Sequence, residues 1–386
     1  MFAVGIMRDK PGVHTLELPK PEVKKSDDVL VRVKQVGLDG TDFNMIRYNL
    51  QDLPPERSEM VIGHEVVGVV ESVGDKVKSV KQGDAVTITV RRGCGECTPC
   101  LHNTSDMCLT GRYKERGLHK LDGFLTQFVV DQEQYVAKVP PELVNMAVFT
   151  EPISIVEKGI QQLRVIQSRL PWTCSHPEHG FDSPQWGGCK IALVVGAGPL
   201  GLIAVALLRL AGVNVFAADI VPEQHVKANL VHRMGAGYLD ARNKTPAELI
   251  ELGAGEDYLD IIFEASGAAA AALELIRYMS RGSIYVMTGI PREEVLMQID
   301  AALLVRQIVR YNQVLVGCVN SNRSHFETAL GDIGRINSSY RSILDQMLTE
   351  RLSFQDYARA FLPKGPNHIK TVIEVEPWDK ISAKRK

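Results

Sequence analysis

Two patterns of apolar residues divide the chain. Up to about residue 150, short alternating or β-branched runs such as VLVRVKQVG, VVGVVESVG and DAVTITV are separated by the turn segments SDD, VGDKV and KQGD. An apolar period of two residues is typical of half-buried strands, and Gly and Asp favour the tight turns between them. This part of the chain therefore predicts an antiparallel, barrel-like β domain.

From about Lys190 the apolar runs become continuous. They are KIALVVGAG, VNVFAADI, YLDIIFEAS, GSIYVMTG and QVLVGCVN, and all but one pair are separated by segments of helix length. Buried strands that alternate with helices predict a parallel sheet covered on both faces.

Two further segments connect these parts. EPISIVEKGIQQLRVIQSRL predicts a helix that begins after Pro152 and carries one apolar side, formed by Ile153, Val156, Ile160, Leu163 and Ile166. Near the end of the chain, HIKTVIEVEPW predicts a strand that rejoins the first domain.

Composition limits the classes of function. The 386 residues suit two domains, and a net charge of -2 gives no general reason to expect nucleic acid or an anionic membrane as a partner. The start, MFAVGIMRDKPG, lacks the pattern of a signal peptide. The apolar segment Ile191–Gly212 is interrupted early by three glycines and a proline, which favours strand, turn and helix over a membrane span. We therefore expect a soluble, cytoplasmic protein.

A glycine-rich turn follows the predicted strand KIALVV and precedes the apolar run LIAVALLRLAG. It has the pattern G-x-G-x-x-G, made by Gly196, Ala197, Gly198, Pro199, Leu200 and Gly201. In a strand–turn–helix context, these glycines permit a tight turn, close approach of a pyrophosphate and close packing of helix on strand. The N-terminus of the helix supplies free N–H groups for the phosphates. The pattern predicts a dinucleotide site.

Asp219 ends the next predicted strand, at the spacing expected for an acid that binds the adenosine ribose hydroxyls. A 2′-phosphate would meet this carboxylate, and the following Ile220 and Val221 provide no arginine to offset it. The sequence therefore favours NAD over NADP.

Four cysteines lie close together in GCGECTPCLHNTSDMC. Cys94, Cys97, Cys100 and Cys108 have the spacing C-x2-C-x2-C-x7-C. Four thiolates can close a tetrahedron around Zn²⁺ without an open position, which describes a structural site. An iron–sulfur cluster is the chemical alternative, because C-x2-C-x2-C also begins ferredoxin motifs. Without a secretion signal, metal binding is favoured over disulfides.

A second group of cysteines and histidines lies in PWTCSHPEHGFDSPQWGGC, before the first parallel strand. It contains Cys174, His176, His179 and Cys189. The irregular spacing and the many prolines and glycines favour a connection between domains over a third metal site.

GHEVVGVVESVG, the four-cysteine segment and GAGPLG occur in this order, and together they resemble the zinc-dependent medium-chain dehydrogenase/reductase family. ERGLHKLDGF, TEPISIVEK and GCVNSNRSHF are similar to stretches of archaeal-type glucose 1-dehydrogenases. The resemblance implies a GroES-like β-barrel catalytic domain over residues 1–155, completed by about 325–386, and a Rossmann NAD-binding domain over residues 156–324. It also implies two Zn²⁺ ions per subunit, a sugar or polyol substrate, and a homodimer or homotetramer.

The segment LDGTD matches the family's first-ligand segment of an open catalytic zinc site. Asp39 stands where the family usually has cysteine, and a carboxylate is a competent although harder zinc ligand. The resemblance implies His64, in GHE, as the nitrogen ligand, with Glu65 and Glu151 as unranked candidates for the further acid. Three protein ligands and one exchangeable position would let zinc polarise a substrate oxygen.

Other roles follow from the same resemblance. Thr41 matches the hydroxyl that bonds the reacting oxygen and starts a proton relay, whereas Asp42 is expected to be a structural acid that bonds nearby backbone. Positions that contact sugar hydroxyls are matched by Glu115, Glu151 and Asn320. The cofactor site is also expected to include two later segments: Thr288, Gly289 and Ile290, and Cys318, Val319 and Asn320.

Three functions remain open. The leading hypothesis is NAD-dependent oxidation of a cyclic aldose at C1 to the aldonolactone. Val90 and Ile155 stand where glucose dehydrogenases can carry polar residues, which counts against D-glucose itself. The alternative is a zinc-dependent polyol or secondary alcohol dehydrogenase of the sorbitol dehydrogenase type. The third hypothesis, a non-catalytic nucleotide-binding relative, is disfavoured because Asp39, Thr41 and His64 are all present.

Overall fold

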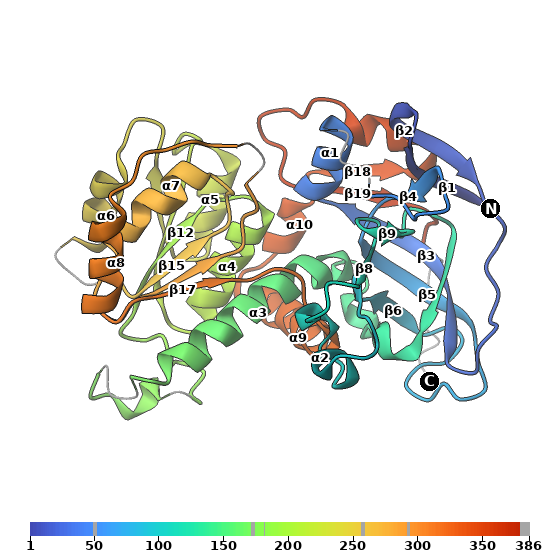
Figure 1. Cartoon of the computed structure of the whole chain (residues 1–386), viewed down its shortest axis with the longest axis horizontal. Helices are drawn as coiled ribbons and strands as arrows, with labels where there is room; N and C mark the ends of the chain where they lie inside the picture. The colour runs from blue at the N-terminus through green and yellow to red at the C-terminus, as the bar shows by residue number, and fades with distance from the viewer. Residues whose placement is uncertain (49–51, 171–173, 181, 256–258, 292–293, 379–386) are drawn as a thin grey trace. The chain divides into compact units, whose positions relative to one another are not determined.

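The structure is a computed structural model that describes residues 1–48, 52–170, 174–180, 182–255, 259–291 and 294–378. The chain forms two compact units (Figure 1). The first unit contains Met1–Ser154, Asn320–Gly334 and Leu344–Lys386, and the second contains Ile155–Val319 and Arg335–Ile343.

The largest sheet of the first unit has seven strands in the order β11-β6-β5-β3-β19-β18, with β10 also paired to β3. Its strands are β3 (Asp28–Leu38), β5 (Glu65–Val73), β6 (Ala85–Ile88), β10 (Phe128–Gln132), β11 (Val136–Lys138), β18 (Glu350–Ser353) and β19 (Thr371–Glu374). All pairs are antiparallel except β18 with β19. Ile373 of β19 lies opposite Val36 of β3, which confirms that the last strand rejoins the first domain.

Two three-stranded sheets complete this unit. One has the order β2-β1-β4 and the other β7-β8-β9. Their strands are β1 (Phe2–Met7), β2 (Lys10–Glu17), β4 (Glu59–Val61), β7 (Arg91–Arg92), β8 (Lys114–Arg116) and β9 (Lys120–Leu121).

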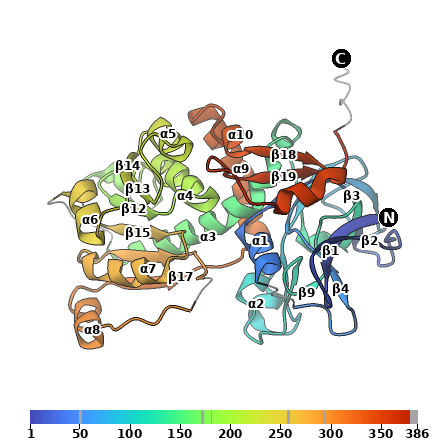
Figure 2. The ribbon, with the colours of Figure 1, turned by 90° about the horizontal axis from the view of Figure 1, so that it is seen from above.

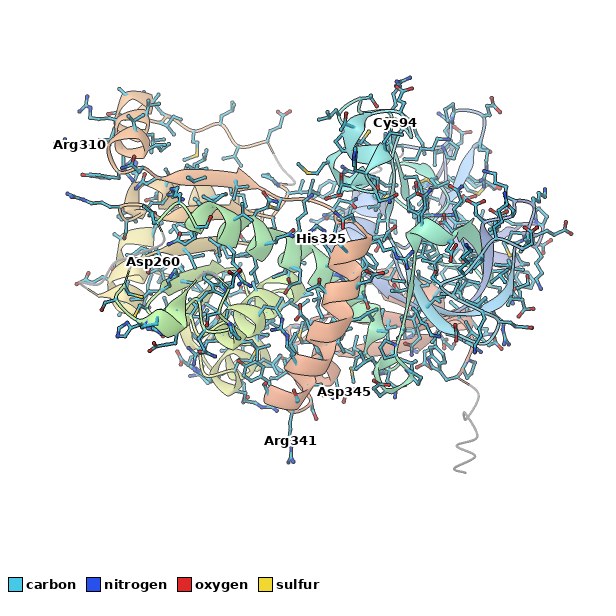
Figure 3. The ribbon with its side chains drawn as sticks, turned by 90° about the horizontal axis from the view of Figure 1, so that it is seen from below. Cys94, Asp260, Arg310, His325, Arg341 and Asp345 are labelled. Atoms are coloured by element: carbon cyan, nitrogen blue, oxygen red, sulfur yellow. The ribbon has the colours of Figure 1, made fainter. Side chains whose placement is uncertain are left out.

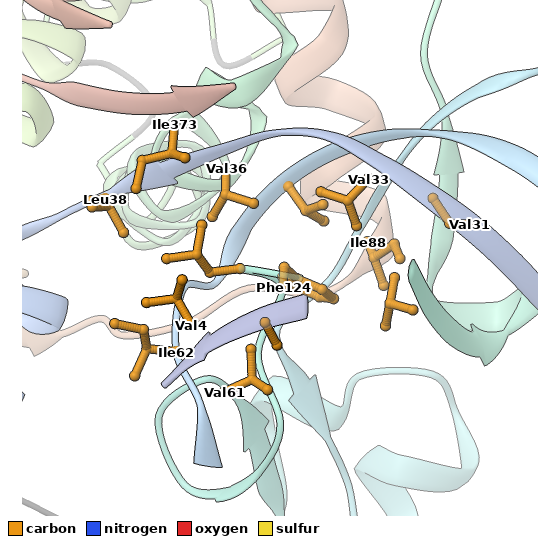
Figure 4. Packing of buried hydrophobic residues seen from close by; sticks show 14 of the residues in the cluster. Val4, Val31, Val33, Val36, Leu38, Val61, Ile62, Ile88, Phe124 and Ile373 are labelled. Carbon is orange, nitrogen blue, oxygen red and sulfur yellow. The ribbon is translucent and has the colours of Figure 1, made fainter. Parts of the chain in front are cut away.

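The core of the first unit is built from β-branched and aromatic side chains. Val36 and Leu38 of β3 pack with Val4, Phe124 and Ile373, and all five are almost completely buried (Figure 4). Burial of each such side chain stabilises the fold by roughly 1.5–3 kcal/mol. Strand β3 is buried along nearly its whole length, which holds the segment that follows it in a defined place.

Two long helices, α3 (Thr150–Gln167) and α9 (Arg323–Ser339), contribute residues to both units. Helix α3 begins at Thr150, two residues before Pro152, so the predicted start after Pro152 is wrong. A proline is tolerated in the first turn of a helix because its missing N–H has no partner there. Short helical segments also include α1 (Gly40–Arg47), α2 (Thr98–Leu101), η1 (Ser105–Met107), η2 (Glu133–Tyr135), η3 (Pro141–Leu143), η4 (Ala147–Phe149), α10 (Ile343–Met347) and η7 (Phe354–Phe361).

The second unit contains a parallel sheet with the order β14-β13-β12-β15-β16-β17. Counted along the chain, this order is 3-2-1-4-5-6, the arrangement of doubly wound dinucleotide-binding sheets. The strands are β12 (Ile191–Val195), β13 (Asn214–Asp219), β14 (Gly237–Asp240), β15 (Ile261–Glu264), β16 (Ile284–Met287) and β17 (Val314–Gly317). The five predicted strands are all present, and β14 was missed because it is a short GYLD segment.

Helices cover both faces of this sheet. Leu193, Ile262 and Tyr285 pack with residues of one group of helices, whereas Phe263 and Val286 lie beside Gly159 of α3. In both Figure 1 and Figure 2, α4 and α6 lie on opposite sides of the strands. The helical segments are η5 (Pro177–His179), α4 (Pro199–Leu210), α5 (Val226–Arg233), α6 (Pro246–Ala254), α7 (Ala269–Leu275), η6 (Ile276–Tyr278) and α8 (Ala301–Arg310).

The apolar segment Ile191–Gly212 forms β12 and α4, as predicted. Within the described part of the chain, no helix combines the length and the hydropathy that a membrane span requires.

Candidate active site

Asp39 follows strand β3 directly and caps the N-terminus of α1. Its Oδ1 accepts hydrogen bonds from the backbone N–H groups of Thr41 at 2.6 Å and Asp42 at 3.1 Å. The Thr41 hydroxyl donates to Asp39 Oδ2 at 3.1 Å. Asp42 completes a capping box by accepting from the Asp39 N–H at 3.1 Å. The turn therefore fixes the position of the Asp39 carboxylate.

His64 is buried beside this turn. Its Nδ1 lies 3.5 Å from Asp42 Oδ1, and its Nε2 lies 3.7 Å from Asp39 Oδ1. Asp42 also accepts a hydrogen bond from the Gly63 N–H at 3.2 Å, so it bonds backbone as the sequence suggested. The 3.7 Å separation is too long for a hydrogen bond. It is close to the edge of about 3.4 Å between nitrogen and oxygen ligands around tetrahedral zinc. Asp39 and His64 therefore fit two ligands of one ion.

Two further acids adjoin His64. The carboxylates of Glu65 and Glu151 and the imidazole of His64 have one potential ligand atom each within 4.8 Å of the others, and Asp39, Asp42 and His64 form a second such group. We refer to these residues together as the acid–histidine cluster: Asp39, Asp42, His64, Glu65 and Glu151.

Lys370 forms an ion pair with only one of the two glutamates, Glu65 and Glu151, within the described residues. Its Nζ donates to Glu65 Oε1 at 2.7 Å, and both side chains are only 1% exposed. Among the described residues, no ion pair or hydrogen bond engages the Glu151 carboxylate, which is 5% exposed as a residue. Glu65 is therefore already neutralised by a lysine, whereas Glu151 keeps its acceptor capacity.

The cluster attracts positive charge. Burial lowers the pKa of His64, but the carboxylates of Asp42 and Asp39 act more strongly and raise that pKa well above its ordinary value. Burial pushes the pKa of Asp39 upward, yet His64 and Lys370 outweigh it and hold that pKa below its usual range. Burial raises the pKa of Glu151 to about 8. The field that favours a protonated imidazole also favours a divalent cation.

Glu115 and Asn320 form a polar pair in the same unit. Glu115 Oε1 accepts hydrogen bonds from Asn320 Nδ2 at 2.7 Å and from Arg91 Nε at 2.9 Å and Nη2 at 2.8 Å. Within the described residues, no hydrogen bond reaches the second oxygen, Oε2. Asn320 has a φ of 59°, a left-handed conformation that Asn tolerates better than most residues. The pair thus presents one preoriented carboxylate oxygen.

The cysteine lobe, residues Cys94–Cys108, brings its four sulfurs within 4.8 Å of one another. Cys94 Sγ and Cys100 Sγ lie 3.9 Å apart, near the sulfur–sulfur edge of about 3.8 Å expected around zinc. The Cys97 N–H donates to Cys94 Sγ at 3.4 Å. A hydrogen bond from the Thr110 hydroxyl lowers the pKa of Cys94 to about 6. Cys94 is labelled in Figure 3. This set fits a closed structural metal site.

The glycine-rich turn in the second unit has the conformation that a phosphate-binding turn requires. Gly196 has a φ of +94°, and a Cβ on Gly201 would lie 1.7 Å from Gly196 O. A Cβ on Gly198 would meet no atom within 4 Å, so the N-terminus of α4 faces open space. Free N–H groups at an open helix N-terminus fit a pyrophosphate.

Asp219 lies at the end of β13 beside this turn. Its Oδ2 accepts from the Ala197 N–H at 2.7 Å, and Lys227 Nζ lies 3.5 Å from the same oxygen. Lys227 sits in the first turn of α5 and was not expected from the sequence. It places a positive charge where the sequence showed only Ile220 and Val221.

The other predicted cofactor segments also follow strands of this sheet. Thr288, Gly289 and Ile290 come after β16, and Thr288 donates its hydroxyl to Glu264 O at 2.8 Å. Cys318 and Val319 come after β17, and Lys158 Nζ donates to Val319 O at 3.1 Å. Since parallel strands end at one edge, these segments share the carboxyl edge of the sheet with the glycine-rich turn. Asn320, expected in both sites, belongs to the first unit.

Three positioning residues could not be predicted from the sequence. Lys370, Arg91 and Lys227 each contact a predicted acid from a segment that carries no motif. Lys370 is 305 residues from Glu65 in the sequence, so no spacing pattern connects the two. The one signal that the sequence gives is a single charged residue next to the apolar strand TVIEV. The other two have no comparable signal.

Comparison with known proteins decides the family. The profile of the glucose dehydrogenase C-terminus matches residues 144–375, which is more than half of the chain. The chain belongs to the glucose dehydrogenase family. The alcohol dehydrogenase GroES-like domain matches residues 25–141 of this family member, which confirms the predicted GroES-like and Rossmann architecture.

Individual relatives align with this chain over nearly its full length. Glucose 1-dehydrogenase of Methanocella arvoryzae is 31% identical, covering 95% of this chain and 97% of the relative. Glucose 1-dehydrogenase 1 of Caldivirga maquilingensis is 32% identical, covering 98% and 99%. The structure of Haloferax mediterranei glucose dehydrogenase in complex with NADP, Zn and gluconolactone superposes with a TM-score of 0.86 at 27% identity, covering 98% of this chain and 100% of that one.

Proposed function

We propose that this enzyme oxidises a cyclic aldose at C1 to the aldonolactone with a nicotinamide dinucleotide. The observation that carries the proposal is the pairing of Asp39, whose side chain is partly exposed, with the buried His64 in a cluster that contains three buried carboxylates. Full-length relatives that are glucose 1-dehydrogenases, and a related structure that holds gluconolactone, support the same reaction. In the proposed step C1 loses a hydride to the nicotinamide and its hydroxyl loses a proton, so the substrate gives up two electrons and two hydrogen nuclei, one on the reduced cofactor and one as a released proton.

The metal ligands are proposed from the contacts described above. Asp39 and His64 would hold zinc, and Glu151 is preferred to Glu65 as the further acid because Lys370 neutralises Glu65. A zinc ion bound there would supply Lewis acidity toward the oxygen on C1. We propose the cysteine lobe as a structural zinc site, which together with the ion at Asp39 and His64 accounts for the two ions that the family resemblance implies.

Two side chains are proposed to take part in removing the proton from the hydroxyl on C1. The Thr41 hydroxyl is oriented by its hydrogen bond to Asp39 Oδ2 and would contact the reacting oxygen. Glu151 would accept the proton when a water molecule, rather than its own carboxylate, occupies that position on the zinc, since within the described residues no ion pair already engages it. A positioned base of this kind contributes about 10²–10⁴-fold to a rate.

Glu115 and Asn320 are proposed to bind sugar hydroxyls. Glu115 Oε2 can accept from a hydroxyl while Oε1 remains bonded to Arg91 and Asn320. Val90 is buried and apolar and Ile155 is half-buried, so neither can pair a hydroxyl. An unpaired buried hydroxyl would cost about 1–3 kcal/mol. The preferred substrate is therefore expected to differ from D-glucose in a hydroxyl or its orientation.

For the cofactor, we propose NAD in preference to NADP, with a smaller margin than the sequence suggested. Asp219 would repel a 2′-phosphate, whereas Lys227, 3.5 Å from its carboxylate, can attract one. Asp219→Asn should raise the ratio of kcat/KM for NADP to that for NAD by about tenfold or more, since one tenfold step corresponds to about 1.4 kcal/mol. Lys227→Met should lower the same ratio. If neither substitution changes it, this pair does not select the cofactor.

The remaining proposals concern assembly and compartment. We propose a cytoplasmic homodimer or homotetramer that acts on a small-molecule sugar without nucleic-acid or membrane partners. The first unit is proposed as the catalytic domain and the second as the nucleotide-binding domain.

A substrate panel tests the proposed reaction. Purified enzyme is incubated with NAD or NADP and with aldoses, their 1-deoxy analogues and open-chain polyols, and formation of the reduced cofactor is followed. We expect turnover with aldoses, none with 1-deoxy analogues, and release of an aldonolactone. Turnover only with polyols would replace the proposal with the sorbitol-type alternative, and no turnover with any of them would refute both.

A further inference from the structure

A second cysteine- and histidine-rich segment lies in the second unit, between helix α3 and strand β12. We refer to residues 174–180 and 182–189 as the Cys–His loop. Its four potential ligands lie within 4.8 Å of one another, although the sequence analysis favoured a simple connection. The cluster consists of Cys174, His176, His179 and Cys189.

The distances suit a tetrahedral metal ion. Cys174 Sγ lies 3.4 Å from His179 Nδ1, and Cys189 Sγ lies 3.3 Å from His176 Nδ1. Around zinc, with bonds of about 2.3 Å to sulfur and 2.0–2.1 Å to nitrogen, a sulfur–nitrogen edge measures about 3.6 Å. The two cysteine–histidine pairs therefore have nearly the spacing of two opposite edges of one coordination tetrahedron.

A short helical turn explains how irregular sequence spacing produces this arrangement. Segment η5 (Pro177–His179) is a 3₁₀ turn, and side chains three residues apart lie over one another in such a turn. His176 and His179 are accordingly adjacent, with ring centroids 4.9 Å apart. The sequence pattern C-x-H-x2-H…C does not predict this turn, because proline is also typical of irregular connections.

The other side of the cluster is anchored to the turn that follows helix α4. Trp186 is 4% exposed, the Gly187 N–H donates to Ala211 O at 3.0 Å, and Lys190 Nζ donates to Trp186 O at 3.0 Å. A Cβ on Gly188 would lie 2.1 Å from His179 Nε2, so only glycine leaves room for this ring. Cys189 is thus held next to β12 on an anchored turn that also accommodates His179.

We propose that the Cys–His loop is a structural zinc site, with the four side chains of Cys174, His176, His179 and Cys189 as ligands. Two thiolates and two imidazoles are a common ligand set for structural zinc, and four protein ligands leave no position open for a substrate. The ion cross-links the end of the loop that follows α3 to the turn that precedes β12. This site is independent of the proposed reaction and of the cysteine lobe.

Cysteine labelling of the unaltered protein tests the site without any substitution. The zinc-loaded full-length protein is treated with N-ethylmaleimide before and after removal of metal by a chelator, and the labelled peptides are identified by mass spectrometry. Cys189 is exposed, so it should react at once unless a metal protects it. We expect Cys174 and Cys189 to be labelled only after chelation. Labelling before chelation, or a Cys174–Cys189 disulfide in the purified protein, would overturn the proposal.

Zinc stoichiometry of variants supplies the second test. Native mass spectrometry of the full-length protein should show that Cys174→Ser and His179→Asn each lose one zinc ion per chain relative to the unaltered protein. Glu178→Gln is the matched control, because Glu178 is an exposed acid between the two histidines that is not among the four ligands. An unchanged zinc count in both ligand variants would overturn the site. Since labelling reports Cys174 and Cys189 separately, failure here remains distinct from failure of the other zinc sites.

Discussion

Asp131 and the acid–histidine cluster are both acidic sites buried in the first unit, but their charges are balanced differently. Asp131 accepts hydrogen bonds from two arginines, with Arg92 Nε at 3.0 Å from Oδ1 and Arg116 Nη2 at 2.8 Å from Oδ2. Burial would raise the pKa of Asp131, but Arg92 and Arg116 outweigh it and lower that pKa. One carboxylate here faces two cations.

The acid–histidine cluster has the opposite balance. Four carboxyl groups surround one imidazole, and within the described residues Lys370 is bonded to Glu65 while no ion pair reaches Glu151. Buried charge without compensation is costly, so a stable fold normally pairs it. The charge of Asp131 is thus balanced within the fold, whereas the excess of acid around His64 supports our proposal that this cluster binds a divalent cation.

The largest expected effect distinguishes the ligand role of Asp39 from its role as a helix cap. Asp39→Asn keeps a good capping oxygen but removes the anionic ligand, and it should lower kcat/KM by at least about 10³-fold, or roughly 4 kcal/mol. Thermal stability and nucleotide binding should change little, because the proposed nucleotide-binding residues other than Asn320 belong to the other unit. The measurements are steady-state kinetics, zinc content and Tm.

Asp39→Cys is the converse control, since it restores a zinc ligand but removes the capping carboxylate. It should keep zinc and measurable activity while losing about 1 kcal/mol of stability. If Asp39→Asn stays fully active while Asp39→Cys does not, Asp39 acts only as a cap.

The next largest effect concerns Asp131, whose charge is balanced by two arginines. Asp131→Asn should reduce the free energy of unfolding by about 3 kcal/mol, because it leaves two buried arginines without their carboxylate. Because the pKa of Asp131 is lowered in the folded protein, its contribution is present above its ordinary pKa and is lost as the pH falls below it. The variant should therefore lose less stability on acidification than the unaltered protein.

Asp345→Asn is the matched control for this substitution. Asp345 also accepts from an arginine, Arg351 at 3.3 Å, but the side chains of Asp345 and Arg351 are 55% and 37% exposed. Exposed pairs contribute about 0–1 kcal/mol, so chemical denaturation should show a much smaller loss. If both variants lost the same free energy of unfolding, burial would not determine how much an ion pair contributes to stability.

The smallest expected effect is a gain in stability rather than a loss. Burial raises the pKa of Glu151 from 4.5 to about 8, so between these values the folded chain binds more protons than the unfolded chain. The stability of chelated protein should therefore fall as the pH rises through this window. Glu151→Gln should reduce this fall and raise Tm near pH 8 by a few degrees, at about 2–4 °C for each kcal/mol.

Glu65→Gln should instead destabilise the chelated protein, because it leaves the buried Lys370 unpaired. Zinc added back to the unaltered protein should suppress its pH dependence. If Glu151→Gln were less stable than the unaltered protein at pH 8, the claim that the Glu151 carboxylate lacks a balancing positive charge would be wrong.

Local patterns explain most of what the sequence could predict. The glycine-rich turn, Asp219 and the four cysteines lie in short motifs, and the strands that carry them have clear apolar periods. Asp39 and His64 were identified only through a resemblance, since no local rule brings residues 25 positions apart to within 3.7 Å. Helix α1, which Asp39 caps, has a weak apolar pattern and was not predicted.

Long-range and turn-dependent contacts account for the rest. Lys370 reaches Glu65 because β19 pairs with β3, and Arg91 reaches Glu115 because β7 pairs with β8. Such pairings depend on tertiary topology rather than on residue spacing. The Cys–His loop was read as a connection because its ligands converge through a 3₁₀ turn and a packed glycine rather than through a familiar repeat.

The most direct measurement is anomalous diffraction at the zinc edge from crystals of catalytically active enzyme. The account predicts an anomalous peak within about 2.0–2.2 Å of both Asp39 Oδ1 and His64 Nε2, separate from the peak in the cysteine lobe. Crystals that contain zinc in the cysteine lobe but none beside Asp39 and His64 would contradict the account.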